Sequence, residues 1–361
     1  MRPPPLTHLR ALTDDTGVAQ HAHMDVPNRA EGYCTDDVAR AFMVAIQASA
    51  HEATRQEGID LGRAYLSFVV HAQRADGRFR NFMAYDRRWL EDVGSEDSCG
   101  RAVWALGFGA RYAPIERWRT LCSAAVVRAL PSIETFSWLR ARAYAMLGLS
   151  SAASVEGAPP PFAETLAGLG RDLVARYHAA RAPGWDWFEG TMTYDNARLS
   201  EAALRAGAAL GDATLVETGL ATLAFYESVV FEGERFVPIG NRGWYRRGEA
   251  RARYDQQPLE AAAMVDAELA AHAATGDEAR LARAHEAFSW YLGKNDLETT
   301  LVRDGGCSDG IAPDSVNENM GAESTLAYLA SAFALAEAEE ARVAKYTRDD
   351  RRNRRPERRP A

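Results

Sequence analysis

Acidic residues at the starts of predicted helices are the side chains of this sequence that could do chemistry. They recur in segments that resemble one another, each leading from a long loop into a helix: Tyr33-Cys-Thr-Asp-Asp-Val-Ala-Arg, Ser95-Glu-Asp-Ser-Cys-Gly-Arg, Thr193-Tyr-Asp-Asn-Ala-Arg, Arg253-Tyr-Asp-Gln-Gln-Pro and Asn317-Glu-Asn-Met-Gly-Ala-Glu. The candidate catalytic carboxylates are Asp36, Asp37, Asp97, Asp195 and Asp255. If these helix starts converge, crowding raises some carboxyl pKa values while helix termini lower others, and an acid/base pair needs such a split. Any single one could instead be a helix cap, because Asp is a preferred N-cap residue.

A second tier of carboxylates lies one to two helical turns further along. Glu201, Glu260 and Glu323 follow Asp195, Asp255 and Asn317 by 6, 5 and 6 residues. A carboxyl held at that depth against aromatic side chains is a possible proton donor. The alternative is an ordinary ion pair with a neighbouring arginine.

Tryptophan and tyrosine gather in the predicted long loops, beside Asp, Asn and Arg. A sugar ring has an apolar C–H face that stacks on an aromatic ring and a rim of hydroxyls that bind charged groups. The candidate substrate-binding residues are therefore Tyr33, Trp185, Trp187, Arg242, Trp244, Asn317 and Glu323. The alternative is that these loops pack on one another and need large apolar side chains to do so.

The sequence predicts neither a cofactor nor a metal. It contains no P-loop, no G-x-G-x-x-G, no H-E-x-x-H and no G-x-S-x-G motif. Its four cysteines form no C-x-x-C pair, and we expect free thiols in a reducing cytoplasm. A zinc site of Cys34, Cys99 and Cys307 with His21 or His23 is an alternative, although metal ligands usually have tighter local spacing.

Helical periodicity dominates the chain and supplies the elements that must position these residues. Amphipathic stretches cover Asp37–Ala50, Gly62–Gln73, Cys99–Tyr112, Trp118–Leu130, Ser137–Leu149, Phe162–Ala180, Ala197–Leu210, Ala213–Val230, Leu259–Thr275, Glu278–Leu292 and Ala322–Glu340. Most long connections precede an odd-numbered helix in this series, so in a stack of antiparallel helices the long loops share one face. A short hairpin is possible around Arg235–Ile239.

A degenerate repeat indicates how the helices are arranged. The anchors Asp37, Asp97, Asp195, Asp255 and Asn317 are spaced 60, 98, 60 and 62 residues apart, and the long gap holds one further helix pair. Six such hairpins predict an all-α, single (α/α)6 barrel whose inner helices are rich in Ala and Gly. The segment Leu6–Leu12 or the end of the last helix would fill the twelfth place. An open helical-repeat scaffold is the alternative.

Charge and hydropathy exclude some classes of partner. The chain has 361 residues with 42 Lys and Arg against 50 Asp and Glu, a net charge of −8, and this acidic body argues against nucleic acid. No apolar run approaches the length that spans a membrane, and we expect no secretory signal. We expect residues 1–346 to form the barrel domain and the basic segment 347–361 to be a disordered tail that can be deleted without loss of stability.

The chain resembles the six-hairpin glycosidase-like superfamily in its repeated hairpins, acidic helix starts and Trp-rich loops. The segment Tyr33-Cys-Thr-Asp-Asp-Val-Ala-Arg-Ala is similar to the paired aspartates of bacterial endo-mannanases. That similarity implies catalytic roles for Asp36 and Asp37. The segment from Asn317 to Ala327 resembles uncharacterised bacterial proteins often linked with sugar transferases, which implies association with such an enzyme.

The function that we expect is hydrolysis or phosphorolysis of a glycosidic bond in an oligosaccharide or glycoside. One carboxylic acid would protonate the leaving oxygen and a second carboxylate would act as base or nucleophile. The alternatives are a uronide lyase, a sugar epimerase, and a non-catalytic scaffold that binds a glycan or a partner. Epimerases of this architecture use histidines in the barrel, and the sequence shows no clear pair on inner helices. The lack of a basic cluster in the funnel argues against a polyuronate substrate.

Overall fold

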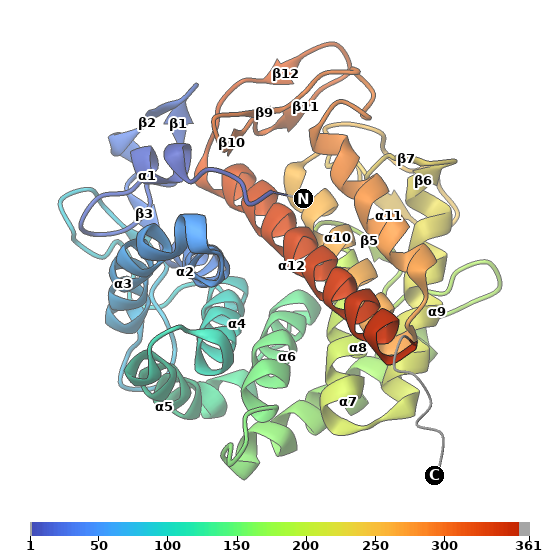
Figure 1. Cartoon of the computed structure of the whole chain (residues 1–361), viewed down its shortest axis with the longest axis horizontal. Helices are drawn as coiled ribbons and strands as arrows, with labels where there is room; N and C mark the ends of the chain where they lie inside the picture. The colour runs from blue at the N-terminus through green and yellow to red at the C-terminus, as the bar shows by residue number, and fades with distance from the viewer. Residues whose placement is uncertain (1, 354–361) are drawn as a thin grey trace, which may run out of the picture.

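The computed structural model describes residues 2–353, with side chains described as far as residue 344 (Figure 1). Residues 354–361 of the predicted tail lie outside the described residues. The described part contains twelve α-helices: α1 Thr7–Leu12, α2 Thr35–Ala50, α3 Arg55–Ala72, α4 Glu96–Tyr112, α5 Glu116–Ile133, α6 Leu139–Ala153, α7 Pro160–Ala180, α8 Ala197–Leu210, α9 Ala213–Val230, α10 Pro258–Thr275, α11 Glu278–Phe288 and α12 Ala322–Asn353.

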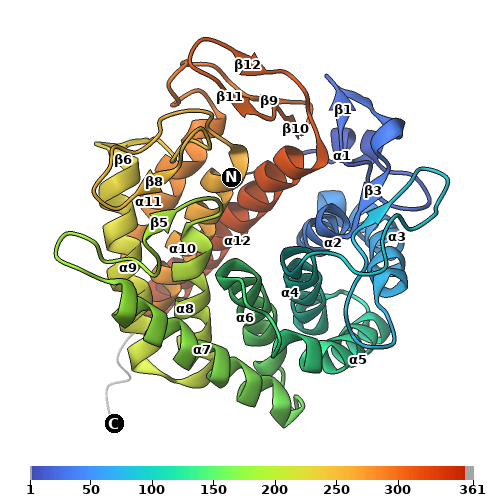
Figure 2. The same ribbon diagram turned by 180° about the vertical axis from the view of Figure 1, so that it is seen from behind.

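Six helices form a closed inner ring. Each of α2, α4, α6, α8, α10 and α12 packs against the next, and α12 packs against α2, so the last hairpin meets the first (Figures 1 and 2). The outer helices α3, α5, α7, α9 and α11 each cover the inner helix that precedes them in the chain. The short helix α1 packs on α12 and takes the sixth outer place. The predicted all-α (α/α)6 barrel is confirmed.

All six inner helices begin at the same end of the ring, and the long connections lie there. These loops contain six antiparallel pairs of two-residue strands: β1 Ala22–His23 with β2 Val26–Pro27, β3 Tyr33–Cys34 with β4 Phe82–Met83, β5 Thr191–Met192 with β8 Tyr245–Arg246, β6 Phe231–Glu232 with β7 Arg235–Phe236, β9 Val302–Arg303 with β10 Gly306–Cys307, and β11 Gly310–Ile311 with β12 Val316–Asn317. The pairs β3–β4 and β5–β8 each join two different loops, and the other four pairs each lie within one loop. The pair β6–β7 coincides with the predicted hairpin around Arg235–Ile239. The opposite end of the ring carries the short connections.

Small residues allow the inner helices to come close together. A Cβ atom on Gly107 of α4 would overlap the carbonyl oxygen of Gly148 on α6, and one on Gly100 would lie 2.6 Å from the carbonyl oxygen of Ala141. In α10 the run Ala261–Ala263 is buried against its neighbours. Larger apolar residues fill the layer between the two rings, where Phe42, Tyr65 and Tyr226 are fully buried.

Helix α3 begins seven residues earlier than predicted. Its first turn, Arg55-Gln-Glu-Gly, is polar and carries no apolar period that could mark the helix start. The further helix pair predicted in the long gap is present as α6 and α7. Helix α5 continues through Pro131 to Ile133, three residues beyond its predicted end, and α6 starts at Leu139.

Candidate active site

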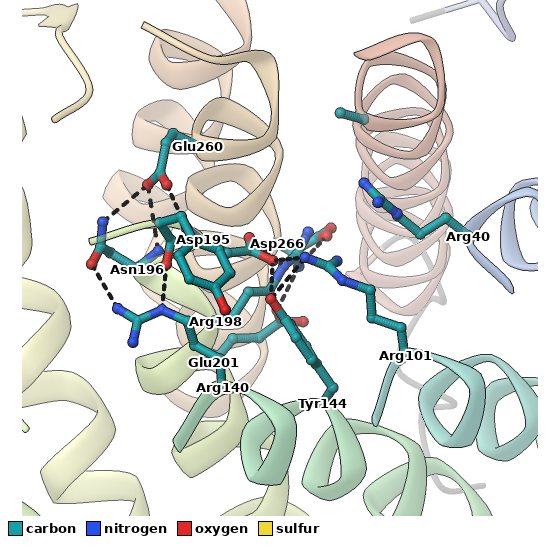
Figure 3. A network of polar contacts seen from close by, with 12 residues as sticks. Arg40, Arg101, Arg140, Tyr144, Asp195, Asn196, Arg198, Glu201, Glu260 and Asp266 are labelled. Atoms are coloured by element: carbon teal, nitrogen blue, oxygen red, sulfur yellow. Dashed lines mark hydrogen bonds and ion pairs between the residues drawn. The ribbon is translucent and has the colours of Figure 1, made fainter. Parts of the chain in front are cut away.

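A layer of arginines and carboxylates crosses the inside of the ring near the starts of the inner helices (Figure 3). Its first centre is Arg40 of α2. The guanidinium lies 2.5 Å from Asp36, 3.2 Å from Asp37 and 3.0 Å from Glu323 of α12. The structure thus brings together three predicted site residues, two from the first hairpin and one from the last.

Asp37 is the most buried of these three carboxyls. Burial raises its pKa to about 6, although the Arg40 charge acts in the opposite direction. The Cys34 thiol donates a hydrogen bond to its Oδ2 atom at 3.0 Å. A carboxyl in this state can exchange a proton near neutral pH.

The second centre is Arg101 of α4, which joins the layer to Asp195. The guanidinium donates to Asp195 at 3.0 Å and to the Tyr144 hydroxyl at 2.8 Å, and its Nε atom lies 3.3 Å from Asp36. The Tyr144 hydroxyl also donates to Asp195 at 2.7 Å. Burial opposes ionisation of Asp195, but the charges of Arg101 and Arg198 outweigh it and hold its pKa below the ordinary value.

The backbone around Asp195 is held by a second-tier carboxylate. Asp195 has a φ of 50°, in the left-handed region, and its N–H donates to Glu260 of α10. The N–H of Asn196 and the Tyr226 hydroxyl donate to the same carboxyl at 3.4 Å and 3.0 Å. Burial, together with the charge of Asp195, raises the pKa of Glu260 to about 7. Glu260 therefore positions Asp195 rather than lining the mouth.

The third centre is Arg198 of α8, which faces away from the loop end. It donates to Glu201 and to Asp266, each at 2.6 Å, and lies 4.7 Å from the centre of the Trp104 ring. Glu201 also accepts from Arg205 at 2.6 Å. Glu201 therefore has the arginine partners that the ion-pair alternative predicts.

Asp97 lies at the start of α4 in a different setting. It is partly exposed and accepts a hydrogen bond from the Tyr194 hydroxyl. Among the described residues, no arginine or lysine forms an ion pair with it within 4.0 Å. Burial raises its pKa, and the charge of Asp36 adds to that effect. The Tyr194 ring lies 6.5 Å from that of Trp244, so an aromatic surface adjoins this carboxyl.

Other predicted site residues lie outside this network. Asp255 pairs with Arg242 at 3.0 Å, and the Arg242 side chain is 62% exposed. Asn317 is an exposed residue of β12.

Trp185 and Trp187 are fully buried, packed on Phe225, Tyr245, Phe188 and Tyr226. Tyr33 is also buried, and its hydroxyl donates to Asp14 at 2.6 Å. These three aromatic residues pack the loop layer.

The sequence reasoning missed the arginines and Tyr144. The expectation that the funnel lacks a basic cluster is wrong, because Arg40, Arg101, Arg140 and Arg198 all take part in the polar network. A signal was present in the repeated segments, where Arg follows Asp by three or four residues at Arg40, Arg101 and Arg198. Each of these arginines is paired with carboxylates, so the cluster offers little net positive charge to a polyuronate.

Metal and membrane features are absent from the described part of the chain. No three His, Cys, Asp or Glu side chains there come together in a way that could hold a metal ion. All four cysteines are free and buried. None of the helices within residues 2–353 is long and apolar enough to cross a membrane.

Comparisons with known proteins identify the fold. No family model and no curated protein matches the sequence. Among solved structures, the chain is similar to cellobiose 2-epimerase from Bacillus thermoamylovorans, with a TM-score of 0.71 at 12% identity, covering 93% of this chain and 96% of that one. It is also similar to a D-mannose isomerase, with a TM-score of 0.72 at 9% identity, covering 92% and 94%. An α-mannanase of glycoside hydrolase family 76 from Bacteroides thetaiotaomicron gives a TM-score of 0.59 at 11% identity, covering 84% and 86%. These likenesses show that the chain has the (α/α)6 fold of these three structures.

Proposed function

We propose that the protein is a carbohydrate-active enzyme that cleaves a glycosidic bond at the long-loop end of the ring, by hydrolysis or phosphorolysis. The observation that carries the proposal is the contrast between Asp97 and Asp36 at the starts of neighbouring inner helices. Asp97 has a raised pKa and no ion pair with a described residue, whereas Asp36 is paired with Arg40 and Arg101. The first setting suits a proton donor, and the second, beside two guanidinium groups, suits the carboxylate that acts as base or nucleophile.

The surrounding residues support each role. Tyr194 orients the Asp97 carboxyl, and the ring of Trp244 beside Tyr194 offers a surface for the apolar face of a sugar. Arg40 of α2 donates hydrogen bonds to Asp36 and to Glu323, which belongs to α12 on the other side of the ring closure. These contacts fix the position of Asp36, the second carboxylate of the reaction. In the reaction, Asp97 gives its proton to the leaving oxygen, and Asp36 activates the water or phosphate or attacks the anomeric carbon.

The test is turnover of a panel of oligosaccharides and glycosides, α- and β-mannosides among them, in water and in phosphate. The Asp97→Asn variant keeps the shape and removes the ionisable group, so its rate should fall by a factor of roughly 100 to 10,000. Asp212→Asn is the matched control, because Asp212 caps α9 at the short-connection end and Asn caps about as well as Asp. Near-wild-type turnover by Asp97→Asn would remove the proposal.

A second candidate is epimerisation or isomerisation of a sugar, which is favoured by the likeness to an epimerase and an isomerase with TM-scores of 0.71 and 0.72. It differs from cleavage in needing neither water nor phosphate as a reactant. Incubation with sugars in D2O separates the two. Deuterium at a sugar carbon without bond cleavage would favour the second candidate.

Four free, buried thiols suit a reducing cytoplasm, and this is the compartment that we propose. The sequence resemblance around Asn317 supports association with a sugar transferase. Co-purification of the tagged protein from its own cells would test the association.

A further inference from the structure

A cavity of about 550 Å³ lies inside the ring on the far side of the charged layer from the long loops. Its lining includes Gln47 and Ala50 of α2, Tyr112 of α4 and Ala338 of α12. These residues belong to the later turns of inner helices, which all begin at the long-loop end. Tyr112 is 45% exposed. The mouth of the cavity is therefore at the short-connection end, opposite the site proposed for sugar cleavage.

The walls of this cavity are mostly apolar. They are formed chiefly by small and aliphatic residues of α10 and α12 and by aromatic residues of α4: Leu259, Ala262, Leu269, Leu326, Ala327, Ala330, Ala334, Trp104 and Phe108. A volume of this size lies within the roughly 300–1,000 Å³ of small-molecule sites. Apolar surface removed from water by a bound hydrocarbon chain would stabilise the complex.

The inner end of the cavity is polar and balanced in charge. Five arginines line the cavity, Arg40, Arg101, Arg198, Arg205 and Arg342, together with five carboxylates, Asp195, Glu201, Asp266, Glu278 and Glu337. The innermost guanidinium groups already have carboxylate partners. The cavity therefore offers no surplus charge of either sign to a ligand.

The same inner end keeps hydrogen-bonding capacity. The Nε–H groups of Arg101 and Arg198 are buried and make no hydrogen bond with a described residue, although carboxylate oxygens of Asp36 and Asp195 lie 3.3 Å and 3.4 Å from them. Their side chains are only 6% and 7% exposed. Carboxylate oxygens of Asp195 and Glu201 lie beside them. Such a surface can donate to and accept from hydroxyl groups, and a buried unsatisfied donor favours a ligand that supplies an acceptor.

We propose that this cavity binds an uncharged amphipathic molecule, with a hydroxylated head against Arg101 and Arg198 and an apolar tail between α10 and α12. The tail follows the alanine-lined face of α12 towards the short-connection end. This site adjoins the proposed sugar-cleavage site, because Arg40 and Arg101 line the cavity and also pair with Asp36, but the proposal does not rest on that reaction.

The test is calorimetric titration of the purified protein with n-octyl β-glucoside below its micelle concentration. We expect one molecule bound per chain. Methyl β-glucoside lacks the tail and octanoate carries a charged head, so each should bind more weakly by roughly tenfold or more. Comparable binding of methyl β-glucoside would overturn the role of the tail, and tighter binding of octanoate would overturn the uncharged head.

Substitutions that fill the cavity test whether the ligand binds there. Ala334→Phe fills the cavity and should weaken octyl glucoside binding by roughly tenfold or more. Ala338→Phe, nearer the mouth, serves the same purpose if Ala334→Phe does not fold. Ala175→Phe on the exposed face of α7 is the matched control and should bind as the wild type does. Unchanged binding in a folded cavity variant would overturn the site.

Discussion

Glu260 couples the stability of the barrel to pH. Its carboxyl is buried and its pKa is raised to about 7 in the folded protein, against about 4.5 in an unfolded chain. A raised carboxyl pKa means that the folded state binds more protons between these two values. The contribution of Glu260 to the free energy of unfolding is therefore fully present below pH 4.5. It falls by about 3 kcal/mol as the pH rises to 7.

The Glu260→Gln variant should not show this loss. The free energy of unfolding of the wild type, measured with urea, should fall relative to that of the variant between pH 4.5 and pH 7. The variant itself should be less stable at low pH, because Gln presents an amide where Glu260 accepts backbone N–H groups. A difference between the two proteins that stays constant with pH would show that Glu260 ionises normally.

The raised pKa of Asp97 predicts how turnover depends on pH. A proton donor must be protonated, so the rate should fall as the pH rises through the raised pKa of Asp97. The Tyr194 hydrogen bond stabilises the ionised carboxylate and lowers that pKa. Tyr194→Phe should therefore move the alkaline limb to higher pH. A limb that stays in place would assign it to another group.

At the residue scale, the acids of the site could be predicted from the sequence but their partners could not. The Asp-to-Arg spacing of three or four residues at Arg40, Arg101 and Arg198 is also that of exposed ion pairs on any helix. Only the closure of the ring buries these arginines and brings Arg101 to Asp195, which is 94 residues away. Burial of Trp185 and Trp187 is equally a property of the assembled loops.

At the element scale, the contact between α4 and α6 depends on glycine. Because a Cβ on Gly107 would overlap the carbonyl oxygen of Gly148, Gly107→Ala forces the two backbones apart. We expect a loss of at least about 1–3 kcal/mol of stability. Gly168→Ala on α7 is the control, since its Cβ would meet its nearest atom only at 3.9 Å and Ala should add about 0.5–1 kcal/mol. Thermal unfolding of both variants measures the contrast, and equal melting temperatures would contradict it.

The helices could be predicted because each amphipathic pattern lies within one continuous segment of the chain. The strand pairs could largely not be predicted, because each strand has only two residues, too few to show an alternating pattern, and two of the six pairs, β3–β4 and β5–β8, join different loops. The alternation of long and short connections predicts the topology, because it requires all inner helices to run in the same direction.

At the scale of the molecule, the ring closes through contacts between the two ends of the chain. Helix α12 packs against both α10 and α2, and Glu323 binds Arg40 across the second of these interfaces. Glu323 is 42% exposed, so this ion pair adds at most about 1 kcal/mol, and apolar packing must supply the rest.

Because the ring is closed, we expect a destabilising substitution in α12 to lower the stability of both inner helices that pack on it, α10 and α2. Leu329 is fully buried in α12, and Leu329→Ala should cost about 2–5 kcal/mol. In an open array of repeats, α2 would lie five hairpins away and keep its stability. In the closed ring, the slowest-exchanging amides of α2 and α10 should lose the same protection, because both helices pack on α12. Native-state hydrogen exchange of the wild type and of Leu329→Ala measures this. Acceleration confined to α10 and α11, with α2 unchanged, would show that the hairpins unfold as an open array despite their closed arrangement.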